Sequence, residues 1–483
     1  MFLIAKRLVT KIISIFINIK ILKYQSSKKK YDYIFYSYNS NDLNLFYYMI
    51  CETLSKFDKK CLIVFLEDIY KNKENIKINN FNIFLNNNFN DLLKKLKNYK
   101  ELKSFYVGFH DFVIRFSDLK VILNKKKINN NFIKNHLKVR EISKKFATLS
   151  KNHIVTDSSY TFNNSLKYFV KKNNNNLFII NQYGDFYNLK NYNHHEKWYN
   201  SLEKRINFIK KKNKYILEAR KIISNSIDGK LTTDKISRFN FKYKKYQNNF
   251  SENKIEKKVL LLHCFRDANM QVYDKSLIFH KYIDWVSFVF NEIKNKQDDW
   301  YIKIHPSINY YSDEKKILSY LQKKFSINSN LINDCPGIEY ILKKNMPIFT
   351  GSGTTSLQSV YNGIKAVVYK DRFNEEIVYK VKSKIDLKVM INLNINELRK
   401  KLSSNLNDSL KNEAALHYYC IYKPEMDLIK LKNPIIPTID RKSFLQSRYN
   451  SSIEIIKNFF SKKYRTKLDK LVLRHLIHDK KNY

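Results

Sequence analysis

Glycine and proline are scarce in this chain, with 7 Gly and 6 Pro among 483 residues. Glycine reaches left-handed backbone conformations without strain, and proline fixes its own backbone angle. Three of the glycines, Gly351, Gly353 and Gly363, nevertheless fall within thirteen residues, and three of the prolines lie between 306 and 347. The segment 300–369 therefore concentrates the special backbone geometry of the chain, and we expect a functional site there.

Cysteine is also scarce and scattered. The five cysteines are odd in number and form no C-x-x-C pair, which argues against a zinc ribbon and against a disulfide framework. Such a pattern is typical of a protein of the reducing cytosol. The cysteines are Cys51, Cys61, Cys264, Cys335 and Cys420.

Acidic residues are few relative to basic ones: 44 Asp and Glu stand against 90 Lys and Arg, a formal net charge of +46. The lysines are spread along the whole chain, which is also rich in Asn, Ile, Tyr and Phe, as an AT-rich genome would dictate. We therefore expect no nucleic-acid partner. An acidic substrate or an anionic membrane surface is the better match for the charge. Ordinary hydrophobic content, 43%, indicates a globular chain.

Residues 1–24 contain no apolar run long enough to span a bilayer, because lysines interrupt every such run. They also lack a small-residue cleavage site, which argues against a secretory signal. The polar positions Arg7, Lys11, Ser14 and Asn18 follow helical spacing. Two interpretations stay open: a basic amphipathic helix lying on the inner face of the cytoplasmic membrane, or an ordinary first helix packed on its domain. We expect a cytoplasmic protein, peripheral at that membrane face.

From residue 31 onward, β-rich runs alternate with helical patterns. This alternation predicts an α/β fold with parallel, doubly wound sheets. The apolar run CLIVFLED at 61–68 is typical of a strand buried on both faces. Strands are expected at 31–38, 61–68, 104–116, 153–156 and 177–181, and helices at 41–56, 282–295, 373–383 and 395–420.

A loss of periodicity before residue 250 marks a linker between two similar β/α halves. We therefore predict two Rossmann-like domains facing a cleft, followed by long basic helices. The expected boundaries are 1–24 for the amphipathic helix, 25–250 for the N-terminal, acceptor-side domain with its linker, 251–440 for the C-terminal, nucleotide-sugar-binding domain, and 441–483 for the C-terminal helices.

The glycine-rich turn in 300–369 reads Gly351-Ser352-Gly353-Thr354-Thr355, after the strand MPIFT and before a helix. Glycines let the backbone approach a ligand, and the helix amino terminus offers free N–H groups to an anion. The spacing matches neither the Walker loop nor G-x-G-x-x-G. We expect this turn to bind a phosphate, although Ser and Thr could instead serve as helix caps.

Basic residues end two predicted strands of the same half. Lys303 and His305 follow an apolar strand, and a proline after His305 keeps it out of helical geometry. His263, Arg266 and Asp267 follow the apolar run VLLL in the same way. We expect these side chains to contact an anionic substrate, because ligands of open α/β sheets bind beyond the carboxyl ends of strands.

Two aspartates of the N-terminal half occupy equivalent positions. Asp157 follows the strand HIVT, and Asp185 follows LFII and a short loop. Each is a candidate for catalysis or substrate binding, and each could also be a plain helix N-cap.

The motifs KIHPS and TGSGTTSLQSVYNGIKAVVY, with HCFRDAN upstream, resemble bacterial capsule and surface-polysaccharide glycosyltransferases. That group includes β-Kdo transferases, and sialyltransferases share a related signature. The resemblance is clearest over 257–370. It implies a GT-B fold and a sugar nucleotide, often CMP-linked, as the donor. The acceptor would be a growing capsule or lipopolysaccharide glycan, anionic or lipid-linked.

The resemblance also implies roles for single residues. His305 would contact the donor phosphate, Ser352, Gly353, Thr354 and Thr355 would line the phosphate site, and Asp157 would be the general base. Related donor sites often carry a Glu in the following helix that grips a ribose, and Gln358 stands in its place here.

The predicted reaction is an inverting displacement in which a base deprotonates an acceptor hydroxyl. No DxD-like metal motif stands near the predicted site, so we expect no metal and no further cofactor. Two alternatives stay open: a polyol-phosphate transferase of the CDP-glycerol type, and a non-catalytic nucleotide-binding scaffold of capsule assembly. A sugar-nucleotide epimerase would share the fold without an acceptor glycan.

Overall fold

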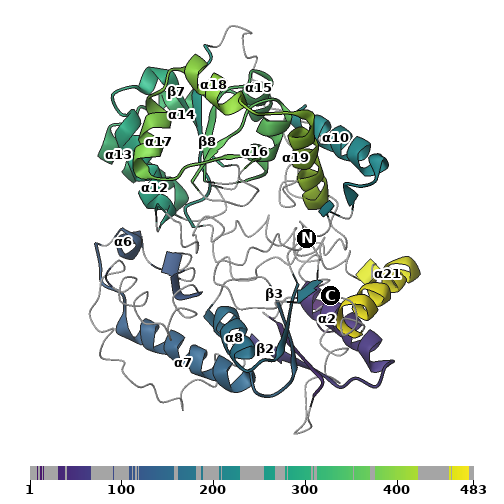
Figure 1. Ribbon diagram of the computed structural model, residues 1–483. Coiled ribbons are helices and arrows are strands. Elements are labelled where there is room, and N and C mark those ends of the chain that lie inside the picture. Colours follow the sequence, from purple (N-terminus) through teal and green to yellow (C-terminus); the bar gives the residue numbers. More distant parts are fainter. Residues whose placement is uncertain are drawn as a thin grey trace. The chain divides into compact units, whose positions relative to one another are not determined.

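The computed structural model (Figure 1) divides into two compact units, here called unit 1 and unit 2. Unit 1 comprises Met1–Glu196 and Pro424–Tyr483, and unit 2 comprises Lys197–Lys423. The structure describes residues 8, 11, 12, 15, 31–37, 41–66, 91, 108–110, 113–114, 117, 119–123, 125–156, 161–180, 186–188, 206–207, 209–228, 255–266, 278–279, 281–305, 308, 313–351, 353–369, 376–422, 456–457 and 460–477.

Unit 1 contains a five-stranded sheet, sheet A, with the strand order β2-β1-β3-β4-β5. The first four strands of that order are parallel, and β5 is antiparallel to β4. The strands are β1 (Tyr33–Ser37), β2 (Cys61–Phe65), β3 (Asn152–Thr156), β4 (Asn176–Ile180) and β5 (Phe186–Asn188). The helical elements are α2 (Asn41–Ser55), α6 (Leu119–Ile122), α7 (Asn130–Phe146), α8 (Thr161–Lys172), α21 (Lys462–Val472) and the π-helical turn η6 (Leu473–Ile477).

Helices cover both faces of sheet A, because alternate side chains of a strand point to opposite faces. In β1, Ile34 and Tyr36 join a core cluster with residues of α7 and α8. Tyr33 and Phe35 join a second cluster, made with residues of α2, α21 and η6. All four side chains are buried, as expected for a parallel sheet sandwiched between helices.

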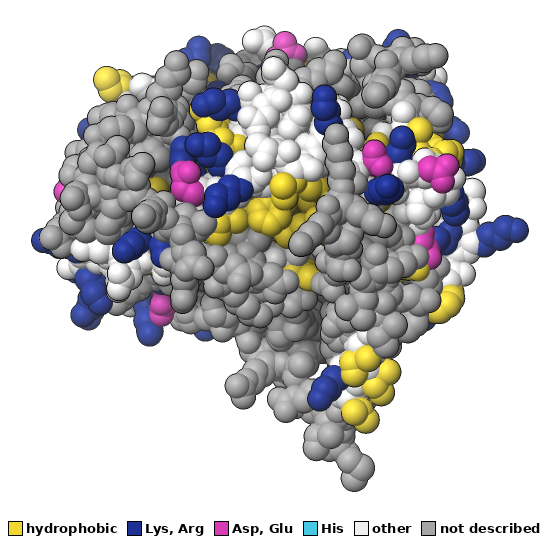
Figure 2. Space-filling view, turned by 90° about the horizontal axis from the view of Figure 1, so that it is seen from below, with side chains coloured by type: hydrophobic (Ala, Val, Ile, Leu, Met, Phe, Trp, Pro, Cys, Tyr) yellow, Lys and Arg dark blue, Asp and Glu magenta, His cyan; other side chains and the backbone are white. Residues whose placement is uncertain are grey.

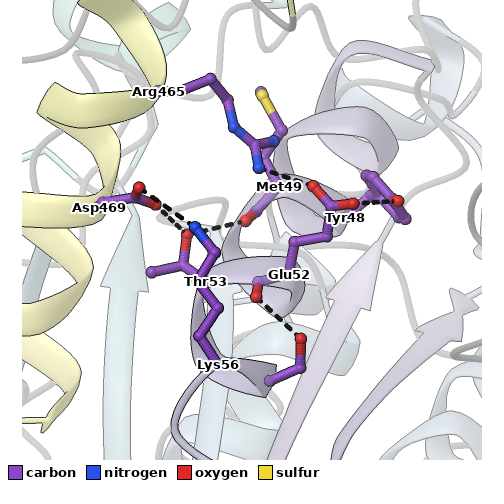
Figure 3. A network of polar contacts seen from close by, with 8 residues as sticks. Tyr48, Met49, Glu52, Thr53, Lys56, Arg465 and Asp469 are labelled. Carbon is purple, nitrogen blue, oxygen red and sulfur yellow. Dashed lines mark hydrogen bonds and ion pairs between the residues drawn. The ribbon is translucent and has the colours of Figure 1, made fainter. Parts of the chain in front are cut away.

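Residues of α21 and η6 contribute to the core of unit 1. Leu468, Leu471, Val472 and Leu476 pack into the cluster around α2. Polar contacts flank this packing (Figure 3): Arg465 donates to Glu52 at 2.7 Å, and the hydroxyl of Thr53 donates to Asp469. Residues 424–483 therefore belong with unit 1 although they follow unit 2 in the sequence.

Unit 2 contains a second five-stranded sheet, sheet B, with the order β10-β9-β8-β6-β7 and parallel pairing throughout. Numbered along the chain within each unit, both sheets have the order 2-1-3-4-5, a common order of doubly wound sheets. The switch point of sheet B lies between β6 and β8. The strands are β6 (Lys258–Leu261), β7 (Trp300–Lys303), β8 (Ile348–Thr350), β9 (Val367–Val368) and β10 (Tyr379–Lys380).

The larger helices of unit 2 form two groups, which Figure 1 draws on opposite sides of β8. In one group α12 contacts α13 and α17, and in the other α19 contacts α10 and α16. The helices of unit 2 are α10 (Asn213–Ile227), α12 (Tyr282–Ile293), α13 (Glu314–Phe325), α14 (Asn330–Asn333), α15 (Ile338–Lys343), α16 (Thr354–Tyr361), α17 (Lys384–Asn392), α18 (Ile395–Ser403) and α19 (Asp408–Tyr422), with the 3-10 turn η4 (Gln297–Asp299).

The α/β class with two parallel-stranded sheets is confirmed, but three local predictions were wrong. The strand expected at 104–116 is helical at its described residues, where Phe109, Val113 and Ile114 are buried at helical spacing. The helix expected at 373–383 instead contains β10, and the helix expected at 395–420 is broken into α18 and α19.

The unit boundaries also differ from the expected domain boundaries. Unit 2 begins at Lys197, because α10 packs on α16 and α19 and so joins the second sheet's helices. Residues 424–440, which were expected in the second domain, are grouped with unit 1. Among the described residues, no helix is long and apolar enough to cross a membrane.

Candidate functional site

Three neighbouring strands of sheet B end at the same level. Leu261, the last residue of β6, pairs with Lys303 in β7 and with Thr350 in β8. The loops that follow these strands therefore leave the sheet side by side at its carboxyl edge. This edge includes the switch point between β6 and β8, where open α/β sheets bind their ligands.

Two histidines lie next to each other at this edge. His263 is two residues beyond Leu261, and His305 is two residues beyond its register partner Lys303. Adjacent strands are about 4.8 Å apart, so equal offsets place equivalent side chains together. The two imidazole rings are stacked with their centroids 5.3 Å apart and their planes 23° apart, and both residues are half-buried.

Gly353 brings the third strand's loop against this pair. Its backbone φ is +146° and ψ is 172°, a conformation that essentially only glycine adopts. A Cβ at this position would lie 3.2 Å from Nε2 of His263. The missing side chain therefore lets His263 sit directly against the start of α16, whose first residues Thr354 and Thr355 are half-buried.

The loop that carries His263 is fixed by buried polar groups. The backbone N–H of His263 donates to the Tyr282 hydroxyl at 2.7 Å. The Glu314 carboxylate, fully buried, accepts from the backbone N–H groups of Phe265 at 2.7 Å and Arg266 at 2.6 Å. Burial raises the pKa of Tyr282 well above its usual value, so its hydroxyl stays neutral. These bonds hold the backbone of the loop that carries His263.

The other predicted basic residues of this edge have partners within the protein. The guanidinium of Arg266 pairs with Asp313 at 2.9 Å and is almost fully buried. The ammonium of Lys303 donates to the carbonyl oxygen of Pro336 at 2.9 Å. Nδ1 of His305 lies 3.7 Å from the sulfur of Cys264, a weak hydrogen-bonding partner.

Gln358 takes part in helix packing. Its amide nitrogen donates to the hydroxyl of Ser226 in α10 at 2.5 Å, and that hydroxyl also bonds to Tyr418 in α19. Gln358 thereby ties α16 to its two neighbouring helices and positions the helix whose amino terminus adjoins Gly353.

The structure thus brings His263, His305, Gly353, Thr354 and Thr355 to one edge of sheet B. It also shows two residues that the sequence did not single out, Glu314 and Tyr282. Neither has a local signal, because an acid in a first helical turn and a tyrosine in an apolar helix are ordinary. The predicted site residues Asp157, Asp185, Asp267 and Ser352 lie outside the described residues.

The chemistry of this edge suits an anion. Helix amino termini attract negative charge, and the two imidazoles can donate hydrogen bonds to phosphate oxygens. Within the described ranges, no group of three His, Cys, Asp or Glu side chains is placed to hold a metal ion.

Comparisons of the chain with protein-family models, with curated proteins and with solved structures found no match.

Proposed function

We propose that this chain is an inverting glycosyltransferase that moves a sugar from a nucleotide donor to a growing surface glycan. Unit 2 binds the donor, with its phosphate at the carboxyl edge of sheet B. One observation carries the proposal: His263, His305 and Gly353 leave three adjacent strands and meet beside the start of α16. Two doubly wound units of the same strand order support a GT-B architecture.

In the proposed reaction an acceptor hydroxyl oxygen attacks the anomeric carbon of the donor sugar. The bond from that carbon to the phosphate oxygen breaks, and the nucleotide leaves with the electron pair. Negative charge grows on the phosphate, where donors already fixed in position stabilise it most effectively. His263, His305 and the first N–H groups of α16 are the candidate donors. The hydroxyl proton passes to a carboxylate, for which Asp157 is the first candidate.

A donor panel tests the proposal. Purified protein is incubated with CMP-, CDP- and UDP-linked substrates and an acceptor glycan, beginning with CMP-linked Kdo and sialic acid. The proposal expects release of the nucleotide and a glycan longer by one sugar with an inverted anomeric centre. Transfer of a polyol phosphate would support the CDP-glycerol alternative. Nucleotide binding without turnover of any donor would support the non-catalytic scaffold.

Paired variants connect the activity to the proposed site. His305→Asn keeps a polar side chain but removes the imidazole, and we expect turnover to fall about a hundredfold. Lys388→Gln is the matched control. It removes an exposed cation of unit 2, on α17, that forms an ion pair with Glu292 on α12. Equal turnover in wild type and His305→Asn would reject the site.

A further inference from the structure

Three aliphatic side chains near the amino terminus face solvent. Residues 8, 11, 12 and 15 are helical, and the exposed fractions of Leu8, Ile12 and Ile15 are 60%, 57% and 52%. Spacings of four and three residues place these side chains within about 60° of one another around the helix. They form a continuous stripe, here called the apolar stripe. An ordinary first helix packed on its domain would bury such a stripe.

The charge of the surrounding segment is one-sided. Residues 1–30 contain eight basic residues and no acidic one. Lys11 is exposed and lies about 40° from Ile15 around the helix, at the edge of the apolar stripe. The basic residues of the segment are Lys6, Arg7, Lys11, Lys20, Lys23, Lys28, Lys29 and Lys30.

An exposed apolar stripe within a segment that has only basic charges differs from the general basicity of the chain. Figure 2 shows described Lys and Arg side chains scattered over the face that it presents, with Asp and Glu among them. Exposed apolar residues also occur elsewhere, for example Ile385 and Val389 on α17. Helix α17, however, carries Asp386 in its first turn. The amino-terminal segment joins an exposed apolar stripe to positive charge without any acid.

We propose that the apolar stripe docks on an anionic membrane surface. Leu8, Ile12 and Ile15 enter the boundary between headgroups and acyl chains, while Lys11 and its basic neighbours contact anionic headgroups. A second copy of the chain is a poorer occupant, because pairing two such segments would bring their positive charges together. This inference does not depend on the glycosyltransferase proposal.

Vesicle co-sedimentation of the full chain tests the proposal. The vesicles are phosphatidylcholine alone or phosphatidylcholine mixed with phosphatidylglycerol. Wild type binds the mixed vesicles more tightly, and added salt weakens that binding. The triple variant Leu8→Gln, Ile12→Gln, Ile15→Gln loses at least about tenfold in affinity. Lys11→Gln loses about fivefold on the mixed vesicles and little on phosphatidylcholine alone.

The matched control is the triple variant Leu217→Gln, Ile385→Gln, Val389→Gln, whose residues are exposed on α10 and α17. It should bind vesicles as wild type does. Both triple variants should unfold at the wild-type midpoint, because all six side chains face solvent. Unchanged binding by the amino-terminal triple variant overturns the proposal, as does an equal loss in the control. Failure of wild type to bind the mixed vesicles, or self-association abolished by the amino-terminal changes, also overturns it.

Discussion

Sheets A and B share a strand order, but the histidines associated with their strands lie at different places. In unit 1, His153 lies inside β3 and is fully buried. Its Nε2 donates to the carbonyl oxygen of Ser150 at 2.9 Å, and its Nδ1 accepts from the hydroxyl of Tyr36 at 2.9 Å. In unit 2, His263 and His305 lie beyond the strands and are half-buried. A histidine within a strand serves the core, whereas a histidine just past a strand can meet a ligand.

The described residues at the carboxyl ends of the strands also differ between the two sheets. In sheet A, the hydroxyl of Ser37 at the end of β1 donates to Asn44, seven residues later. Asn163 donates to the hydroxyl of Thr156 at the end of β3, again seven residues apart. These strand-ending hydroxyls bond to the following helices. The edge of sheet B instead presents two imidazoles and a glycine. The same strand order thus carries different described side chains in the two sheets, and a shared fold does not by itself imply a shared function.

Packing of α21 against the cluster around α2 stabilises unit 1. Leu468 of α21 is fully buried in the cluster around α2. Leu468→Ala should lower the free energy of unfolding by about 2–5 kcal/mol, because the lost burial leaves a cavity. Leu217→Ala, at a 67% exposed position on α10 of unit 2, should change it by less than about 0.5 kcal/mol. Urea unfolding measures both, and a small loss for Leu468→Ala would remove α21 from the core.

Substitutions of His263 and His153 test whether the two histidines have different roles. His263→Ala should lower turnover by about a hundredfold or more, equivalent to about 2.7–4 kcal/mol of transition-state stabilisation. His153→Gln should lower stability while leaving turnover per folded molecule close to wild type. The measurement is nucleotide release, normalised to the folded fraction from circular dichroism. A larger turnover defect in His153→Gln than in His263→Ala would refute the comparison.

The buried histidine also predicts acid sensitivity. Burial lowers the pKa of His153 from 6.5 to about 4, so the unfolded chain binds a proton at this residue before the folded protein does. The contribution of His153 to the free energy of unfolding is therefore at its maximum above pH 6.5. It falls as the pH drops toward 4, by about 3 kcal/mol in total. Urea unfolding at several pH values measures the loss. His153→Gln should flatten this part of the profile, and an unaltered slope would contradict the assignment.

Alanine substitutions at Gly353 and Gly363 separate the effect of backbone strain from the effect of close contact with His263. Gly353 and Gly363 both have positive φ, at +146° and +108°, so alanine should strain either position by about 1–3 kcal/mol. At Gly353 the new Cβ would meet His263. At Gly363 the new Cβ would have no neighbouring atom within 4 Å. Gly353→Ala should therefore weaken nucleotide binding about tenfold, while Gly363→Ala lowers stability alone. Calorimetric titration with the best-bound nucleotide measures the difference; equal affinities would detach Gly353 from the site.

Much of the fold follows from local pattern. Alternating apolar strands and amphipathic helices predict two parallel sheets, because each element must bury its own face. The order of the strands and the return of α21 to unit 1 depend on contacts far apart in sequence, which no local pattern encodes. The segment around Phe109 was misassigned because aromatic and β-branched residues are common in strands, whereas its buried positions follow helical spacing.

The site divides in the same way. Gly353 and His305 stand out in the sequence because glycine is rare and the residue before a proline has a restricted backbone. The sequence could not show that the Arg266 guanidinium is paired with Asp313, or that Glu314 holds the loop of His263. Both facts depend on the start of α13 lying against the loop that follows β6, a tertiary arrangement.

Binding of a nucleotide at the carboxyl edge of sheet B is tested by the shift in melting temperature of the full chain with CMP, CDP, UDP and GDP, in wild type, His305→Asn and Lys388→Gln. A ligand that binds only the folded state raises the melting temperature, and the shift grows with the ratio of ligand concentration to dissociation constant. We expect at least one nucleotide to stabilise wild type and Lys388→Gln equally, and His305→Asn to lose most of this shift. A nucleotide site at His305 is ruled out if no nucleotide stabilises wild type, or if His305→Asn is stabilised as strongly.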